Sequence, residues 1–256
     1  MRVVGILQAR MGSSRLPGKV LINIVGKPML QLQLERLMRS SQIDKLVVAT
    51  TVNNLDKPIV DLCTSLKISC FRGSEEDLLD RYYQTARKHK ADYVVRLTGD
   101  DPLTDPILID EMIKKIKKGR FDAITNSIQP TYPEGLDVTV LSFEALARAW
   151  TEANLQSQRE HVTPYIFDNE NIFKIFHQKQ IQDFSHLRWT VDYEEDVTFI
   201  KKIYEAFYMV NKSFSSPDVY KLIEANPSLL SINSHFLRNA GLIESIKQDK
   251  EVYFDD

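Results

Sequence analysis

The chain lacks the features of several common classes of protein. Its 256 residues include only two cysteines, Cys63 and Cys70, which do not form a C-x-x-C pair, so we expect both thiols to be buried and reduced. No apolar run reaches the roughly 18 residues of a membrane span. The first residues enter a strand-like run without a signal-peptide pattern, which predicts a cytoplasmic protein. The net charge of −2 provides no basic surplus, so nucleic acid is not an expected partner.

The two commonest phosphate-binding loops are also missing. No G-x-G-x-x-G occurs in the chain. A P-loop needs four residues between its glycines and a Ser or Thr after its Lys. Here five residues separate Gly12 from Gly18, and Val20 follows Lys19. Any phosphate site must therefore be of another kind.

Apolar runs alternate with helical patterns along the first half of the chain. The runs predict strands over 1–7, 46–50, 68–71, 93–97 and 122–125, and the patterns between them predict helices over 28–38, 56–66, 74–89 and 106–118, with Ser74 as an N-cap. This alternation favours an α/β fold with a doubly wound, mostly parallel sheet. Further on we expect strands over 136–141, 172–176 (at an edge) and 187–191, and helices over 143–154, 159–167, 194–210 and from Ser216. The length suits a single domain, 1–256, in which about 127–186 forms a small α+β lobe covering the site.

A basic loop follows the first strand. Arg10, Arg15 and Lys19 supply positive charge and forked donors for phosphate oxygens, while Gly12 and Gly18 allow close backbone approach and positive φ. Open α/β sheets bind ligands at the carboxyl ends of their strands, where this loop stands. The loop therefore predicts a polyanion site, with an exposed basic turn as the alternative.

Two acidic positions follow later strands. Asp100 and Asp101 come directly after the fourth strand, and Asp192 comes after the strand expected at 187–191. Carboxylates facing a phosphate loop need a cation between them, and Mg²⁺ binds through one or two carboxylates plus substrate phosphates. Asp100 and Asp192 are thus candidates for one metal site. The alternatives are that Asp100 and Asp101 cap the next helix and that Asp192 is an N-cap with Glu195 as its capping-box partner.

Four stretches, in the same order as in the family, resemble the motifs of a known family. The stretch 9–19 resembles the A-R-x-x-S-x-R-L-P-G-K motif of the CMP-Kdo synthetase and acylneuraminate cytidylyltransferase superfamily, and 26–29 matches its G-K-P-M. The family's Q-G-D-x-P corresponds to 98–102, with Thr98 in place of Gln, and its V-D-T-P-E-D matches 191–196 at four of six positions. The stretches 132–137 and 159–164 look most like its spore-coat polysaccharide biosynthesis (SpsF-like) branch.

The resemblance implies a Rossmann-like nucleotidyltransferase fold and an activity. Such an enzyme transfers CMP from CTP to the anomeric hydroxyl of an acidic sugar, of the Kdo or sialic-acid kind, and releases pyrophosphate. The expected cofactor is Mg²⁺, held by Asp100 and Asp192, and the expected assembly is a homodimer built through the variable lobe. The expected catalytic residues are Arg15, Lys19, Asp100 and Asp192. The expected nucleotide-binding residues are Gln8, Ala9, Arg10, Gly12, Ser13, Ser14, Arg15, Lys19, Thr98 and Asp100. The expected sugar-binding residues are Glu134, Asp137, Arg159 and His161, of which Arg159 or His161 would meet the sugar's carboxylate.

Two other functions stay open at this level. A GT-A glycosyltransferase would consume a nucleotide sugar, but its D-x-D motif is absent, since Pro102 stands where the second acid would be. A non-catalytic nucleotide-binding protein is the other alternative. The base of the nucleotide, C, G or U, is also left open by the sequence.

Overall fold

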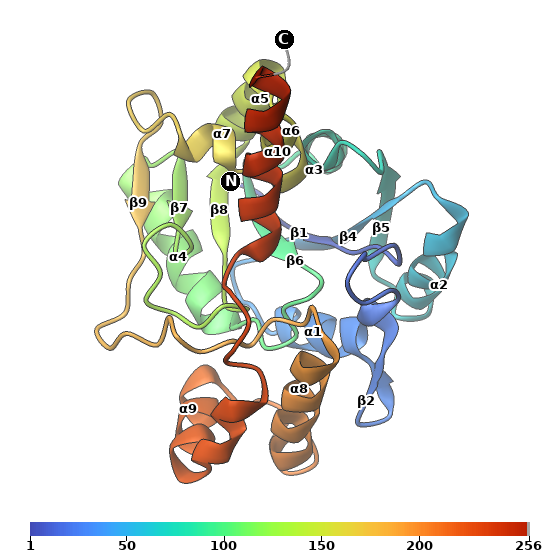
Figure 1. Ribbon diagram of the computed structural model, residues 1–256. Coiled ribbons are helices and arrows are strands. Elements are labelled where there is room, and N and C mark those ends of the chain that lie inside the picture. Colours follow the sequence, from blue (N-terminus) through green and yellow to red (C-terminus); the bar gives the residue numbers. More distant parts are fainter. Residues whose placement is uncertain (255–256) are drawn as a thin grey trace.

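A seven-stranded sheet forms the centre of the protein in the computed structural model, which describes residues 1–254 and side chains as far as residue 251 (Figure 1). The spatial order of its strands is β5-β4-β1-β6-β8-β7-β9. Their bounds are β1 Val3–Gln8, β4 Lys45–Thr51, β5 Ser69–Gly73, β6 Tyr93–Thr98, β7 Ala123–Thr125, β8 Thr139–Ser142 and β9 Ile175–His177. Strands β5, β4, β1 and β6 are parallel, β8 is antiparallel to both of its neighbours, and β9 is parallel to β7 at the edge. The predicted mostly parallel α/β fold is confirmed.

Helices cover both faces of this sheet because the strand residues alternate between two apolar clusters. Leu7 and Leu97 belong to the cluster that also buries residues of α1 Met29–Leu37, α2 Lys57–Ser65, α4 Pro106–Gly119, α8 Glu194–Phe207 and α9 Ser216–Ala225. Ile6 and Val94 belong to the opposite cluster, with residues of α3 Leu78–Lys88, α5 Phe143–Glu152 and α7 Pro164–Phe167. The polar helix α6 Gln156–His161 packs on α3. None of the helices within residues 1–254 is both long enough and apolar enough to cross a membrane.

The reversed strand β8 has a physical cause and a consequence for the site. Residues 126–138 join β7 to β8 without a helix, and a parallel pair needs a long crossover connection, so β8 runs antiparallel. Its first residues consequently lie at the same edge as the carboxyl ends of β1 and β6, with Thr139 paired to Arg96. The segment 127–186 thus contributes β8 and β9 to the main sheet as well as the helices α5 to α7.

Several local expectations are wrong. The helix expected from Ser74 begins after Asp77, whose carboxylate accepts a hydrogen bond from the Asp80 N–H at 2.8 Å. The helix expected over 159–167 is divided at Val162, where φ is +72°, because Pro164 has no N–H to donate and its ring would clash with the carbonyl four residues earlier in a continuous helix. Residues 187–191 form no strand but are extended and bonded to two loops.

Four short elements and one long helix were not predicted. The short elements are a small hairpin of β2 Asn23–Ile24 and β3 Lys27–Pro28 and the 3₁₀ turns Lys19–Leu21, Asn54–Asp56 and Pro227–Ile232. The long helix is α10 Ala240–Phe254, drawn in red across the front of Figure 1. It packs on α6, where the Ser157 N–H donates to Asp249 Oδ1 at 3.2 Å. The polar, Asn- and Ser-rich composition of the chain after Ser213 hid this helix from pattern analysis.

Candidate active site

A cavity of about 790 Å³ opens at the edge of the sheet where β1 and β6 end. Most of the predicted site residues line it: Gln8, Ala9, Arg10, Ser13, Ser14, Arg15, Lys19, Thr98, Asp100, Glu134, Asp137, His161 and Asp192. Two predicted residues, Gly12 and Arg159, are not part of its lining. The fold therefore brings together five stretches that lie apart in the sequence: 8–19, 98–100, 134–137, His161 and Asp192.

The basic loop is closed on its own backbone. Gly18 has a φ of +73° and its N–H donates to the Met11 carbonyl at 2.9 Å. The Met11 N–H donates to Asp56 Oδ1 at 2.7 Å, which ties the loop to the end of β4. Gly18 has the positive φ that a side chain would disfavour, and Gly12 does not. The expectation that Gly12 also adopts a positive φ is therefore wrong.

Lys19 lies at the centre of the site, with a side chain that is 9% exposed. Its Nζ donates to Asp100 Oδ2 at 2.9 Å, to Asp192 Oδ1 at 2.8 Å and to the Val191 carbonyl at 2.7 Å. Arg15 Nη2 lies 2.6 Å from the same Asp192 oxygen. Burial alone would raise the pKa of Asp192, but the charge and hydrogen bonds of Lys19 and Arg15 outweigh it and hold that pKa at about 2. Asp192 is therefore ionised at every physiological pH.

The extended segment before α8 places Asp192 next to Asp100. The Val191 N–H donates to the Asp100 carbonyl at 2.8 Å, which joins the two acidic segments directly. The N-cap of α8 is Tyr193, whose N–H donates to Asp196 Oδ2 at 3.1 Å in a capping box. The alternative that Asp192 caps this helix with Glu195 is thus wrong, and the Asp192 carboxylate is available to the cations of the site.

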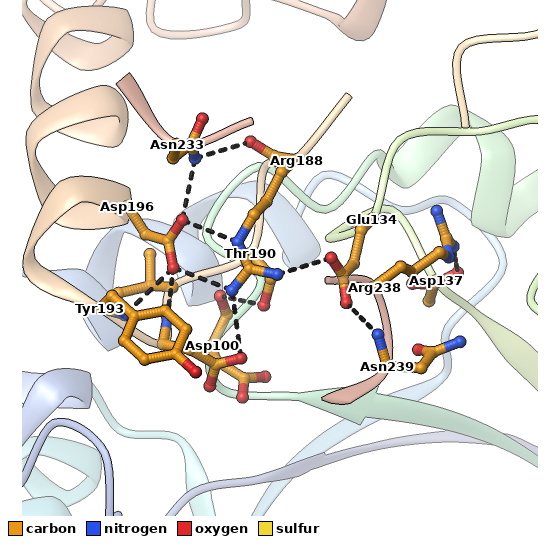
Figure 2. A network of polar contacts seen from close by, with 12 residues as sticks. Asp100, Glu134, Asp137, Arg188, Thr190, Tyr193, Asp196, Asn233, Arg238 and Asn239 are labelled. Atoms are coloured by element: carbon orange, nitrogen blue, oxygen red, sulfur yellow. Dashed lines mark hydrogen bonds and ion pairs between the residues drawn. The ribbon is translucent and has the colours of Figure 1, made fainter. Parts of the chain in front are cut away.

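Arg188 connects this centre to the rest of the cavity wall (Figure 2). Its guanidinium lies 2.6 Å from Glu134 Oε2, 2.9 Å from Asp196 Oδ1 and 3.3 Å from Asp192 Oδ2. The other oxygen of Glu134 accepts a hydrogen bond from the Asn239 N–H at 2.8 Å. Both Glu134 oxygens are therefore engaged within the protein, and this residue shapes the wall of the site.

The loop before β8 approaches the backbone of the extended segment closely. Gly135 has a φ of +99°, and a Cβ there would lie 2.5 Å from the Thr190 nitrogen. Two residues on, Asp137 Oδ1 lies 2.5 Å from Arg238 Nη2. Burial raises the pKa of Asp137 even against this arginine. The chain just before α10 therefore supplies the partners of both acidic residues of this loop, Glu134 and Asp137.

Asp101 is buried beside Asp100 and does not cap the next helix. Asp105 performs that role for α4, accepting a hydrogen bond from the Ile107 N–H at 2.9 Å. The carboxyl of Asp101 accepts a hydrogen bond from the Thr98 hydroxyl. Burial and the neighbouring charge of Asp100 raise the pKa of Asp101 well above its usual value. Of the two aspartates, only Asp100 contacts a cation of the basic loop.

The two candidates for binding the sugar's carboxylate have different environments. Arg159 is turned away from the cavity, with Nε 3.0 Å from Asp77 Oδ2 and Nη1 donating to the Trp150 carbonyl at 2.7 Å. His161 lines the cavity, and its Nε2 lies 3.0 Å from the Ser245 hydroxyl of α10. Burial and, secondarily, the charge of Arg96 lower the pKa of His161, so its imidazole is neutral at pH 7.

Sequence reasoning missed two groups of cavity residues. Arg81 and Arg96 line the cavity from α3 and β6, and residues 239–242 and Ile246 line it from the start of α10. A signal for Arg96 was present, because a charged residue inside the apolar run 93–97 is unusual in a central strand. No comparable pattern marked the residues of α10.

Comparisons with known proteins identify the family of the chain and several similar proteins. The profile of a family described as cytidylyltransferase matches residues 4–216. The chain is 38% identical over 237 residues to an uncharacterised protein of Methanocaldococcus jannaschii, covering 92% of this chain and 96% of that protein. It is 33% identical over 228 residues to the spore coat polysaccharide biosynthesis protein SpsF of Bacillus subtilis, covering 85% and 90%.

A shorter match and a solved structure complete the comparison. A 3-deoxy-manno-octulosonate cytidylyltransferase of Chlamydia trachomatis is 34% identical over 139 residues, covering 52% of this chain and 53% of that protein. The solved structure of a cytidylyltransferase from Leptospira borgpetersenii superposes with a TM-score of 0.87 at 35% identity, covering 93% of this chain and all of that one.

Proposed function

The chain belongs to the cytidylyltransferase family, and from this we propose that it transfers CMP from CTP to the anomeric hydroxyl of an acidic sugar for surface-polysaccharide synthesis, releasing pyrophosphate. The similarity to SpsF supports the polysaccharide pathway, and that to 3-deoxy-manno-octulosonate cytidylyltransferase supports a Kdo- or sialic-acid-like acceptor. The observation that carries the proposal is the convergence of Asp100 and Asp192 on Lys19 Nζ beside Arg15, inside a cavity of nucleotide size.

The donor set of the site suits Mg²⁺. Asp100 and Asp192 place oxygens within 2.9 Å of one cationic nitrogen, so these two carboxylates are close enough to share a metal ion once Lys19 moves aside. No group of three or more His, Cys, Asp or Glu side chains suited to a metal occurs in the described part of the chain. Mg²⁺ matches a two-carboxylate site, since substrate phosphates and water supply its other ligands. When bound, Mg²⁺ would lower the pKa of the attacking hydroxyl and offset charge on the α-phosphate.

The residues of the basic loop act on the phosphates. The sugar hydroxyl attacks the α-phosphorus in line and gives up its proton to solvent, and the bond from that phosphorus to the β-phosphate oxygen breaks as pyrophosphate leaves. Arg15 and Lys19, which stand beside the two carboxylates before the substrates bind, turn to the phosphates and neutralise the charge that develops on the departing pyrophosphate. Arg10 lines the same cavity and contributes to triphosphate binding. Gln8, Ala9, Ser13, Ser14 and Thr98 are the candidates for contacts to the base and ribose.

A thermal-shift screen of CTP, UTP, GTP and ATP, each with and without Mg²⁺, tests the proposal first. A ligand at a hundredfold excess over its Kd stabilises the folded state by about 2.7 kcal/mol, which such a screen detects. Stabilisation by CTP with Mg²⁺, followed by pyrophosphate release on adding a sugar acid, supports the assignment. Stabilisation by another triphosphate changes the base, and stabilisation by UDP- or CDP-sugars alone overturns the proposal in favour of a glycosyltransferase.

The assembly state is a separate prediction. The family resemblance predicts a homodimer through the region 127–186, and sedimentation velocity of the purified chain measures this directly. A monomer at micromolar concentration would contradict the predicted homodimer and would leave the proposed reaction unaffected.

A further inference from the structure

Arg96 is a cation in the central strand of the sheet that faces the cavity. It lies in β6, paired in register with Ile6 of β1 and Thr139 of β8. Its side chain lines the cavity, and its Nε is buried without a hydrogen-bond partner in the described part of the chain. Buried donors in proteins are nearly always hydrogen-bonded, so this N–H points to an acceptor that a ligand brings.

The groups around Arg96 do not neutralise it. Among the side chains described, none of the carboxylates lies within ion-pair distance of Arg96, and Asp137, which senses its charge, is paired with Arg238. His161, which also senses the charge of Arg96, is neutral. Arg96 therefore presents a guanidinium without an ion pair among the described side chains, in the part of the cavity that it shares with His161 and with Glu160, whose carboxylate accepts a hydrogen bond from the Ser245 hydroxyl.

Another arginine of the cavity differs in this respect. Arg81 also has a buried Nε without a hydrogen-bond partner in the described part of the chain. However, its Nη1 donates to the Ser74 carbonyl at 2.5 Å, which holds the guanidinium beside the loop between β5 and α3. The basic loop after β1 already supplies Arg10, Arg15 and Lys19 for a triphosphate. Arg96 is thus available to bind a second anionic group, on the side of the cavity formed by β6 and β8.

We propose that Arg96 binds the carboxylate of the acidic sugar acceptor, with His161 as a neighbouring hydrogen-bonding group. The inference rests on the proposed function, and it replaces Arg159 as the cation for that carboxylate. In a 2-keto sugar acid the carboxylate is bonded to the anomeric carbon, so its binding residue must stand close to the reacting centre. Arg96 stands four residues before Asp100, and both side chains line the same cavity. The planar fork of a guanidinium also matches a carboxylate in two-point contact.

The test compares Arg96→Gln with Arg148→Gln, in which an exposed arginine on α5 loses the same charge. Binding of Kdo and of N-acetylneuraminic acid to the whole chain is followed by saturation-transfer NMR, and CTP binding by calorimetry. We expect Arg96→Gln to weaken binding of the sugar acid by about 10- to 100-fold, as for loss of a charge-assisted contact, and to leave the Kd for CTP within about twofold. Arg148→Gln should change neither.

A second measurement separates carboxylate recognition from a structural role. The ratio of kcat/KM for the sugar acid to that for its methyl ester should be large in the wild type and fall towards one in Arg96→Gln, with partial recovery in Arg96→Lys. An unchanged ratio in Arg96→Gln overturns the inference. The inference is also overturned if the protein binds a sugar phosphate more tightly than the sugar acids and Arg96→Gln weakens that binding as well. The group that Arg96 binds would then be a phosphate. Failure of CTP to bind the wild type would instead refute the proposed function, while sugar-acid binding that depends on Arg96 would still stand.

Discussion

The ammonium of Lys19 donates to Asp192 Oδ1 at 2.8 Å, across 173 positions of sequence. Asp100 accepts from the same nitrogen, so one lysine occupies the position between the two carboxylates that a divalent cation would share. A metal ion that bound these oxygens in the absence of nucleotide would therefore have to displace Lys19. A bound triphosphate would provide other acceptors for Lys19 and remove this competition.

Replacing Lys19 with Met should separate metal binding from turnover. Without the competing ammonium, Asp100 and Asp192 should bind Mn²⁺ at least about tenfold more tightly in the absence of CTP, as measured by electron paramagnetic resonance. The same variant should lose about 100-fold or more in kcat, since the pyrophosphate loses a stabilising charge. Lys27→Met, which removes a lysine paired with Glu35, is the matched control. Unchanged Mn²⁺ affinity in Lys19→Met would contradict the competition.

Asp100→Asn and Asp192→Asn should each abolish turnover while the protein stays folded. Each change removes one of the two charged oxygen donors for Mg²⁺, and we expect pyrophosphate release to fall by about 100-fold or more. Circular dichroism checks the fold, and Asp61→Asn on the surface of α2 serves as the control. Normal pyrophosphate release in either variant would exclude that residue from the metal site.

Arg15→Ala should raise the KM for CTP and lower kcat, each by about tenfold. Arg15 Nη2 lies 2.6 Å from Asp192 Oδ1, and the other N–H groups of its guanidinium are placed to bind the phosphates of CTP. Steady-state kinetics with pyrophosphate detection measures both constants, with Arg148→Ala as the exposed control. Kinetics like those of the wild type would mean that the loop is a basic turn outside the reaction.

Acid should destabilise the protein partly through Asp192. Its pKa in the folded state is about 2, below the ordinary value of 3.8, so its ion pairs stabilise the folded state above about pH 4. That contribution, about 2 kcal/mol, is lost as the pH falls from 4 towards 2. Urea unfolding at pH 6 and pH 3 should therefore show a smaller loss of stability for Asp192→Asn than for the wild type. Equal losses would show that Asp192 is not responsible for the acid sensitivity.

Gly135→Ala should destabilise the fold by at least about 2 kcal/mol. Its φ is +99°, and the added Cβ would lie 2.5 Å from the backbone of Trp189 and Thr190. Neither backbone segment can move far enough to relieve this contact easily. Gly26→Ala is the control, because φ is also positive there but no atom lies within 4 Å of the new Cβ. If urea unfolding gave equal costs for both variants, the close approach at Gly135 would not be what requires glycine.

Local patterns in the sequence were sufficient for the main strands and for the position of the basic loop. Apolar runs such as 46–50 and 93–97 determine buried strands through side-chain periodicity and burial, which are properties of neighbouring residues. The sequence by itself also determined that Arg15, Lys19 and Asp100 follow strands, and parallel pairing of β1 and β6 places strand ends at one edge. These parts of the prediction needed no knowledge of distant contacts.

Only the tertiary structure decided how the distant segments complete the site. The bond from the Val191 N–H to the Asp100 carbonyl places Asp192 beside Asp100 and Lys19, although 187–191 forms no strand and Asp192 taken alone resembles a helix cap. Arg159 pairs with Asp77, while Arg96, hidden in an apolar strand, faces the cavity. The chain around the start of α10 closes one wall, with Asn239 just before the helix bonded to Glu134 and Ser245 within it bonded to His161, in a stretch whose composition predicts no helix. These contacts depend on which charged and hydrogen-bonding groups come together in the folded chain, and residue spacing along the sequence does not specify them.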